Sequence, residues 1–146
     1  MSDTAANQES NVRRLAESLN ARLREVVLLL RRVNADQQVT NQQLSVLGSL
    51  TSGPRRMTEL AAEHGVRLPT MTVLVRRLVR SGLVVRGALR GDARVVTVEL
   101  TPQGAEQLEA GRERRIAFLA ERLSALSVDE RAALVAALPV LRKLFT

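Results

Sequence analysis

The stretch from residue 55 to residue 100 constrains the fold most, because the spacing of its apolar residues changes from helical to strand-like along it. Thr58 can cap a short helix, and Gly65 stands where a left-handed residue would end it. Pro69 suits the first turn of a second helix, which runs as far as Gly82. This part of the chain therefore predicts two short helices joined by a glycine turn.

Two β-branched runs follow the second helix directly. Residues 83–86 and residues 94–100 are rich in valine, and the loop between them contains Gly87 and Gly91. This pattern predicts a β-hairpin with a glycine-bearing loop. Two short helices followed by a hairpin form a winged helix-turn-helix, in which the hairpin is the wing and the second helix turns its polar face outward.

The second helix has two chemically different faces. Met71, Leu74, Val75 and Leu78 share the apolar one. The other face carries Thr70, Thr72, Val73, Arg76, Arg77 and Arg80. Hydroxyl groups bind base edges or phosphates, a valine contacts a thymine methyl, and arginines reach guanine edges or backbone oxygens. A solvated surface would explain any one arginine, but their grouping on one face favours a DNA major groove.

The net charge of +7 is concentrated in one part of the chain. Residues 55–94 contain nine arginines against three acidic residues, whereas the rest of the chain holds 13 basic and 12 acidic residues. Arginines spread evenly over solvated faces would not give this distribution. The localised charge predicts that one module meets a polyanion.

The expected loop of the wing carries its own charges. Arg90, Asp92 and Arg94 lie where the hairpin turns, and a narrow minor groove attracts arginine. Asp92 would repel phosphate, so we expect it to orient Arg94 or Arg90 through a charge-assisted pair. The alternative is an ordinary turn aspartate that hydrogen-bonds locally.

The rest of the chain predicts helices, so the fold class is mainly α with a small β-hairpin wing. Residues 1–10 are polar and predicted to be disordered, and residues 11–146 are predicted to form a single domain. Residues 11–34 carry an apolar stripe at helical spacing. A short helix capped by Thr40 extends to the turn at 53–54, and two longer helices follow within residues 102–146.

The helices outside the winged module are too apolar to be solvated flanks. Their leucines include Leu15, Leu19, Leu119, Leu123, Leu134, Leu138 and Leu141. A bundle within one chain could bury part of them. A homodimer built from residues 11–34 and 102–146 buries more, and its two-fold symmetry would match a palindromic DNA site.

Several classes of function have no support in the sequence. The chain has no cysteine, no glycine-rich phosphate loop and one histidine, His64, which is expected to end the first helix of the pair. We therefore predict no catalytic residues, no metal site, no cofactor and no enzyme activity. No signal peptide or membrane span is evident, so a cytoplasmic protein is expected.

Five short motifs in this order resemble the MarR family of bacterial transcription regulators. They are Leu60-Ala61-Ala62-Glu63-His64-Gly65-Val66, Pro69-Thr70-Met71-Thr72, Leu78-Val79-Arg80-Ser81-Gly82-Leu83-Val84, Gly91-Asp92-Ala93-Arg94 and Val98-Glu99-Leu100-Thr101-Pro102-Gln103-Gly104. The order of elements matches over nearly the whole chain. The Asp-x-Arg of the wing, followed by a strand and Leu-Thr-x-x-Gly, is the most specific part.

The resemblance implies a homodimeric repressor with each recognition helix in a major groove and each wing arginine, here Arg94 steadied by Asp92, in a minor groove. It also implies that a small phenolic or anionic effector, of unknown identity, binds between the dimerisation helices and the DNA-binding lobe and releases the DNA. The DNA-binding residues that we predict are Arg67, Pro69, Thr70, Thr72, Val73, Arg76, Arg77, Arg80, Arg90, Asp92 and Arg94. Two alternatives stay open: an architectural DNA-binding protein without an effector, and a winged helix that binds an acidic protein.

Overall fold

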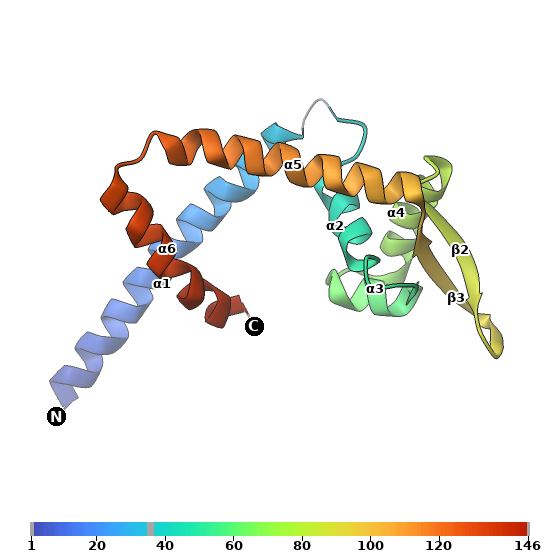
Figure 1. The fold of residues 1–146 in the computed structure, drawn as a ribbon. Coiled ribbons are helices and arrows are strands. Elements are labelled where there is room, and N and C mark those ends of the chain that lie inside the picture. The colour runs from blue at the N-terminus through green and yellow to red at the C-terminus, as the bar shows by residue number, and fades with distance from the viewer. Residues whose placement is uncertain (1, 35–36, 146) are drawn as a thin grey trace. The chain divides into compact units, whose positions relative to one another are not determined.

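The computed structural model describes residues 2–34 and 37–145 of the chain. It is mainly helical with one small sheet, which confirms the predicted fold class (Figure 1). The elements are α1 (Ser2–Val33), α2 (Asn41–Ser49), β1 (Arg55–Arg56), α3 (Met57–Glu63), α4 (Leu68–Arg80), β2 (Val84–Leu89), β3 (Asp92–Leu100), α5 (Pro102–Ser124) and α6 (Val128–Phe145). None of the helices in the described ranges is long and apolar enough to cross a membrane.

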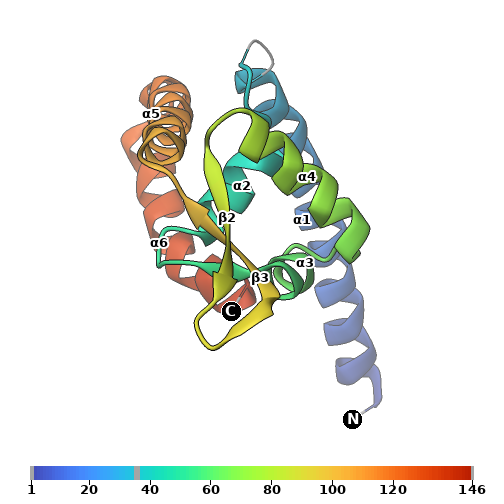
Figure 2. The same cartoon turned by 90° about the vertical axis from the view of Figure 1, so that its right-hand side faces the viewer.

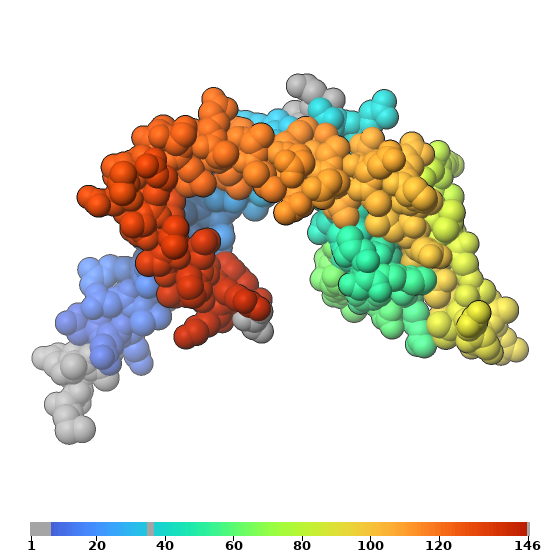
Figure 3. Space-filling view, in the orientation of Figure 1, coloured from blue at the N-terminus to red at the C-terminus, as the bar shows by residue number. Residues whose placement is uncertain are grey.

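The chain divides into two compact units, and the division falls inside α5. The first unit extends to Leu108 and the second begins at Glu109. In the space-filling view, the residues from α2 to β3, coloured teal to yellow, form one continuous mass within the first unit (Figure 3).

One apolar core holds this mass together, and it draws on α2, α3, α4 and the sheet. Its buried members are Val39, Leu44, Val46, Leu47, Leu50, Met57, Leu60, Ala61, Met71, Leu74, Val75, Leu78, Leu83, Val84 and Val98. α2 therefore belongs to the core of the winged lobe, although the predicted lobe began only at residue 55. Because α2 is amphipathic and short, burial against α3 and α4 supplies most of its stability.

The sheet has three antiparallel strands in the order β1-β3-β2. β1, in which Arg55 pairs with Val98, was not predicted because a two-residue strand leaves no periodic signal. The hairpin is also longer than predicted, since β2 continues to Leu89 and β3 begins at Asp92. The chain therefore turns at Arg90-Gly91, and Gly91 has a φ of +90° that favours glycine.

Three predicted helix ends differ from the structure. α1 begins at Ser2, so residues 2–10 continue the helix instead of being disordered, and residue 1 lies outside the described residues. α2 ends at Ser49, before the turn at 53–54 that was expected to stop it. α3 begins one residue before Thr58, and the carboxylate of Glu59 accepts the backbone N–H of Arg56, 3.1 Å away.

The joint between β3 and α5 explains the Leu-Thr-x-x-Gly motif. The Thr101 hydroxyl accepts the backbone N–H of Gly104 at 3.0 Å, which caps α5, and donates to the carbonyl of Gly82 at 2.7 Å. A Cβ on Gly104 would lie 2.0 Å from the Leu83 carbonyl oxygen and 2.8 Å from Leu100 Cδ1. α5 can start here only because its third residue has no side chain.

We expect Gly104→Ala to lower the free energy of unfolding by about 3 kcal/mol, because the added methyl group overlaps backbone that cannot move aside. Urea denaturation followed by circular dichroism measures this. Gly48→Ala is the matched control: its Cβ would meet nothing within 4 Å inside α2, so it should leave stability unchanged or raise it by up to about 1 kcal/mol. Equal stability of the two variants would contradict this account of the joint.

Candidate nucleic-acid interface

α4 presents its predicted polar face to solvent. Met71, Leu74, Val75 and Leu78 are buried, as predicted, and this burial fixes the rotation of the helix about its axis. The exposed residues along it include Pro69, Thr70, Val73, Arg76, Arg77 and Arg80, with Arg67 just before the helix, and also the apolar Leu68 and Val79. The side chains that the sequence predicts for DNA contact from α4 are thus brought together on one surface, with a single exception.

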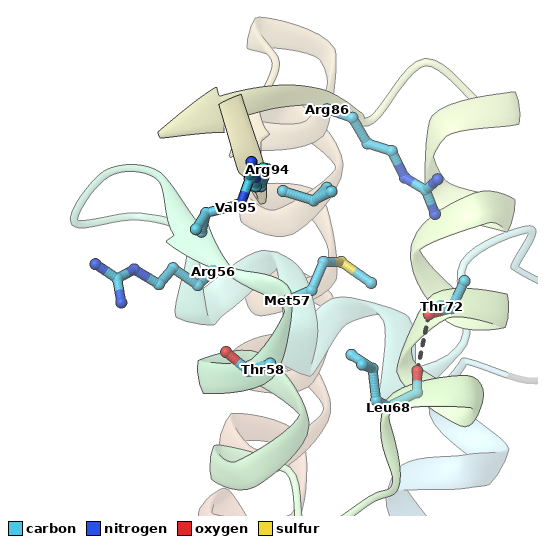
Figure 4. A pocket seen from close by; sticks show the side chains of 9 residues that line it. Arg56, Met57, Thr58, Leu68, Thr72, Arg86, Arg94 and Val95 are labelled. Atoms are coloured by element: carbon cyan, nitrogen blue, oxygen red, sulfur yellow. Dashed lines mark hydrogen bonds between the residues drawn. The ribbon is translucent and has the colours of Figure 1, made fainter. Parts of the chain in front are cut away.

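The exception is Thr72, which is only half-exposed. Its hydroxyl donates a hydrogen bond of 2.8 Å to the carbonyl of Leu68 in the preceding turn (Figure 4). The hydroxyl proton is therefore used inside the helix, and only the oxygen is left to accept a hydrogen bond from a ligand.

A polar network joins α2 to the end of α3, beside the turn of the helix-turn-helix. The Ser49 hydroxyl donates to Glu63 at 2.7 Å and lies 3.0 Å from His64 Nε2, and Arg55 binds the other carboxylate oxygen of Glu63 at 3.1 Å. Because serine has one proton, His64 must be the donor to Ser49. The hydrogen bond from Ser49 and the charge of Arg55 lower the pKa of Glu63. His64 therefore helps to hold α3 in place, and Gly65, with a φ of +61°, completes the turn.

Asp92 is a turn aspartate. Its Oδ1 accepts the backbone N–H of Arg94 at 3.0 Å. In the part of the chain that the structure describes, it forms no ion pair with Arg90 or Arg94, so the expected charge-assisted pair is absent. Asp92 acts on Arg94 through the backbone, because its hydrogen bond fixes the start of β3.

A hollow of about 430 Å³ separates α4 from the wing. Its lining residues are Arg56, Met57, Thr58, Leu68, Thr72, Arg86, Arg94, Val95 and Val96. Figure 4 shows Arg86 reaching from β2 toward α4, whereas Arg56 points away from the other lining residues. The hollow thus combines apolar walls with two cationic side chains, Arg86 and Arg94, which have no carboxylate partner within the described ranges.

Comparison with known proteins gives one consistent result. The sequence profile of the MarR family matches residues 37–95. An HTH-type transcriptional regulator of Mycobacterium tuberculosis is 36% identical over 119 residues, which cover 81% of this chain and 83% of that protein. The chain belongs to the MarR family. This is a family of DNA-binding transcription regulators, not of enzymes.

Solved structures agree with this membership. The apo form of wild-type MarR from E. coli has a TM-score of 0.78 at 28% identity, covering 90% of this chain and 96% of that one. RV1404 from Mycobacterium tuberculosis has a TM-score of 0.79 at 25% identity, covering 91% of this chain and 92% of that one.

Among residues 2–34 and 37–145, this MarR-family chain has no cluster of three or more His, Cys, Asp or Glu side chains that could hold a metal ion.

The residues that line the hollow include Arg56 and Arg86, which sequence reasoning counted as charge but did not assign to the interface. Arg86 could have been found from strand alternation, since it lies opposite the buried Val98 and hence on the face of the wing nearest the core. Arg56 carried no such signal, because its strand is too short to show alternation.

Most of the leucines predicted for dimerisation are exposed. Leu119, Leu123, Leu134, Leu138 and Leu141 are all exposed, as is Leu15, whereas Leu19 is half-buried. Within the described residues, α6 has no buried side chain at all. These apolar faces of the MarR-family chain are therefore not covered by the chain itself.

Proposed function

We propose that this MarR-family chain is a homodimeric repressor in the bacterial cytoplasm, that it binds palindromic double-stranded DNA, and that a small anionic effector releases the DNA. The observation that carries the proposal is the exposed face of α4. That face carries three arginines and Thr70 beside the exposed Val73, and its orientation is fixed by the buried face behind it.

α4 is suited to a major groove because the guanidinium groups of its arginines are not engaged in ion pairs with described residues. Arg76, Arg77 and Arg80 are exposed and pair with no carboxylate in the described part of the chain. An unpaired guanidinium can bind guanine O6 and N7, or a phosphate, without first breaking an ion pair. Thr70 and Val73 stand between the arginines as base-edge contacts, while Arg67 and Pro69 bring backbone close to phosphate.

The wing supports contact with a minor groove. Arg90 and Arg94 are exposed and flank the turn, and the hydrogen bond from Asp92 holds the backbone at Arg94. Arginines are attracted to narrow minor grooves because negative potential concentrates there. α4 and the wing would then bind adjacent grooves of one duplex.

The dimer is supported by the apolar surface of the second unit. In α6, Leu138 is 62% exposed and Val135 67% exposed. Monomeric proteins rarely leave such a stripe in water, and two-fold pairing of identical stripes buries both. The exposed leucines of α1 and α5 likewise need a partner that buries them. A two-fold dimer would also place two copies of α4 on a palindromic site.

Repression follows if the dimer covers a promoter. The Bacillus subtilis HTH-type transcriptional repressor MdtR is 34% identical over 95 residues, which cover 64% of this chain and 61% of that protein.

For the effector we propose the hollow between α4 and the wing, where Met57 and Leu68 offer apolar contact and Arg86 offers a cation. An effector site beside the dimerisation helices stays a prediction.

We expect Arg94→Ala to weaken binding to a selected DNA site by about 1–3 kcal/mol, the range for one groove-inserted arginine. Fluorescence anisotropy with a duplex selected from random sequence measures this. Arg24→Ala, at an exposed position of α1, removes the same charge far from the wing in sequence and is the control. Unchanged affinity in a folded Arg94→Ala variant would refute the assignment of the wing.

We expect Leu138→Asp to convert the dimer into a monomer of 16.0 kDa, because an ionised carboxylate cannot be buried without a partner. Sedimentation equilibrium at micromolar concentration distinguishes the monomer from a species of twice that mass. Ser52→Asp adds the same charge to an exposed turn of the winged lobe and should leave the mass doubled. A wild-type protein that sediments as a monomer would contradict the proposed dimer.

For the effector, hexanoate is a suitable probe because it joins a carboxylate to a short apolar chain. We expect hexanoate to lower the affinity for DNA more than hexanol or an equal concentration of sodium chloride does, and Arg86→Gln to abolish this difference. DNA titrations at constant ionic strength measure it. Equal inhibition by hexanol, or full inhibition in the variant, would argue for a regulator without an effector in this hollow.

A further inference from the structure

A second basic hollow, of about 410 Å³, lies in the first unit and is lined mostly by residues that precede the predicted winged module. Three helices contribute to it. Arg31 comes from the end of α1, Gln42 from the start of α2, and Leu74 and Arg77 from α4. Among the described residues that line it, none is acidic. Nothing in the sequence patterns pointed to a site formed by these elements together.

The walls of the hollow are held in place by buried contacts. Asn34 is 5% exposed, and its side-chain amide donates a hydrogen bond to the side-chain oxygen of Asn41, which ties the end of α1 to the start of α2. Arg31 precedes Asn34 by three residues and therefore lies on the same side of α1. Leu74 is 7% exposed and belongs to the core. Buried residues therefore form part of the wall of the hollow.

The electrostatics of the hollow favour an anion. Arg31 and Arg77 are exposed, and in the described ranges neither forms an ion pair. The first turn of α2 adds partial positive charge at the same place. Two guanidinium groups that form no ion pair with any described residue attract a phosphate more strongly than either would alone.

The position of the hollow relative to α4 identifies the anion. Thr72 lines the hollow beside the wing and Arg77 lines the second one, and five residues of helix place these side chains about 140° apart around the axis. Figure 2 shows α4 beside the wing, with α1 passing behind it. A helix in a major groove about 12 Å wide has a phosphate backbone on each side. The second hollow is therefore on the side where the strand away from the wing would run.

We propose that this hollow binds a DNA phosphate, with Arg31 and Arg77 as its cationic ligands and Gln42 as a hydrogen-bond donor. The proposal rests on the proposed insertion of α4 into the major groove. It extends the DNA-binding surface to the end of α1, a helix that we otherwise assign to the dimer. Because phosphates carry no sequence information, this contact contributes affinity and register but no base preference.

The test compares Arg31→Gln with Arg32→Gln. The two variants remove the same charge from neighbouring exposed residues of α1, but only Arg31 lines the hollow. Anisotropy titrations over a series of salt concentrations use a selected duplex and an unrelated one. Arg31→Gln should weaken binding about threefold to tenfold on both duplexes, and should lower the slope of log affinity against log salt by about 0.9 for each lost phosphate contact. Arg32→Gln should change both quantities much less.

Neutral methylphosphonates placed singly along the duplex locate the contact. At one position per half-site, the wild-type protein should lose affinity and Arg31→Gln should lose none. Identical behaviour of Arg31→Gln and Arg32→Gln, while the wild-type protein binds DNA, would overturn the phosphate contact alone. Failure of the wild-type protein to bind any duplex would overturn the proposed function as well.

Discussion

The rest of the winged lobe depends on the burial of one face of α4. Met71, Val75 and Leu78 are fully buried between α2, α3 and the sheet, and each such side chain is worth about 1.5–3 kcal/mol. These contacts set the rotation of the helix about its axis. Every exposed residue of α4 thereby receives a fixed direction, and the DNA-binding surface is a consequence of the core behind it.

Polar contacts fix the positions of helices that the apolar core alone would allow to shift. Hydrophobic burial is not directional, so α3 and α5 could still slide along their neighbours. Ser49 and Glu63 hold the end of α3 against α2, and Thr101 holds the start of α5 against the end of α4. Hydrogen bonds define the positions of these joints to within a few tenths of an ångström, since their strength falls steeply when they are misaligned.

Local chemistry made much of the fold predictable. The capping box of Thr40 and Gln43, the left-handed Gly65 and the apolar face of α4 each depend on residues within a few positions of one another, and the structure contains all three. β1 and the membership of α2 in the core depend on partners far along the chain, and single-sequence periodicity carries no record of them. The role of Asp92 was predicted wrongly: the sequence led us to expect an ion pair with an arginine, whereas its carboxylate accepts a local backbone hydrogen bond, which was the alternative.

The candidate site was predictable as a list of arginines but not as two hollows. Arg86 and Arg94 are brought together by the hairpin, but only tertiary packing places them beside α4. Arg31 and Arg77 come from helices separated by α2 and α3, so only tertiary packing brings this pair together. This pairing bears on how release would work. An anionic effector beside the wing competes with DNA for Arg86 and Arg94, because one guanidinium cannot fully bind a carboxylate and a phosphate at once. The hollow at Arg31 lies on the other side of α4 and keeps its charge when the effector binds. A liganded regulator would therefore lose the groove contacts of the wing while retaining part of its salt-dependent attraction to any duplex, so release from the specific site need not mean release from DNA.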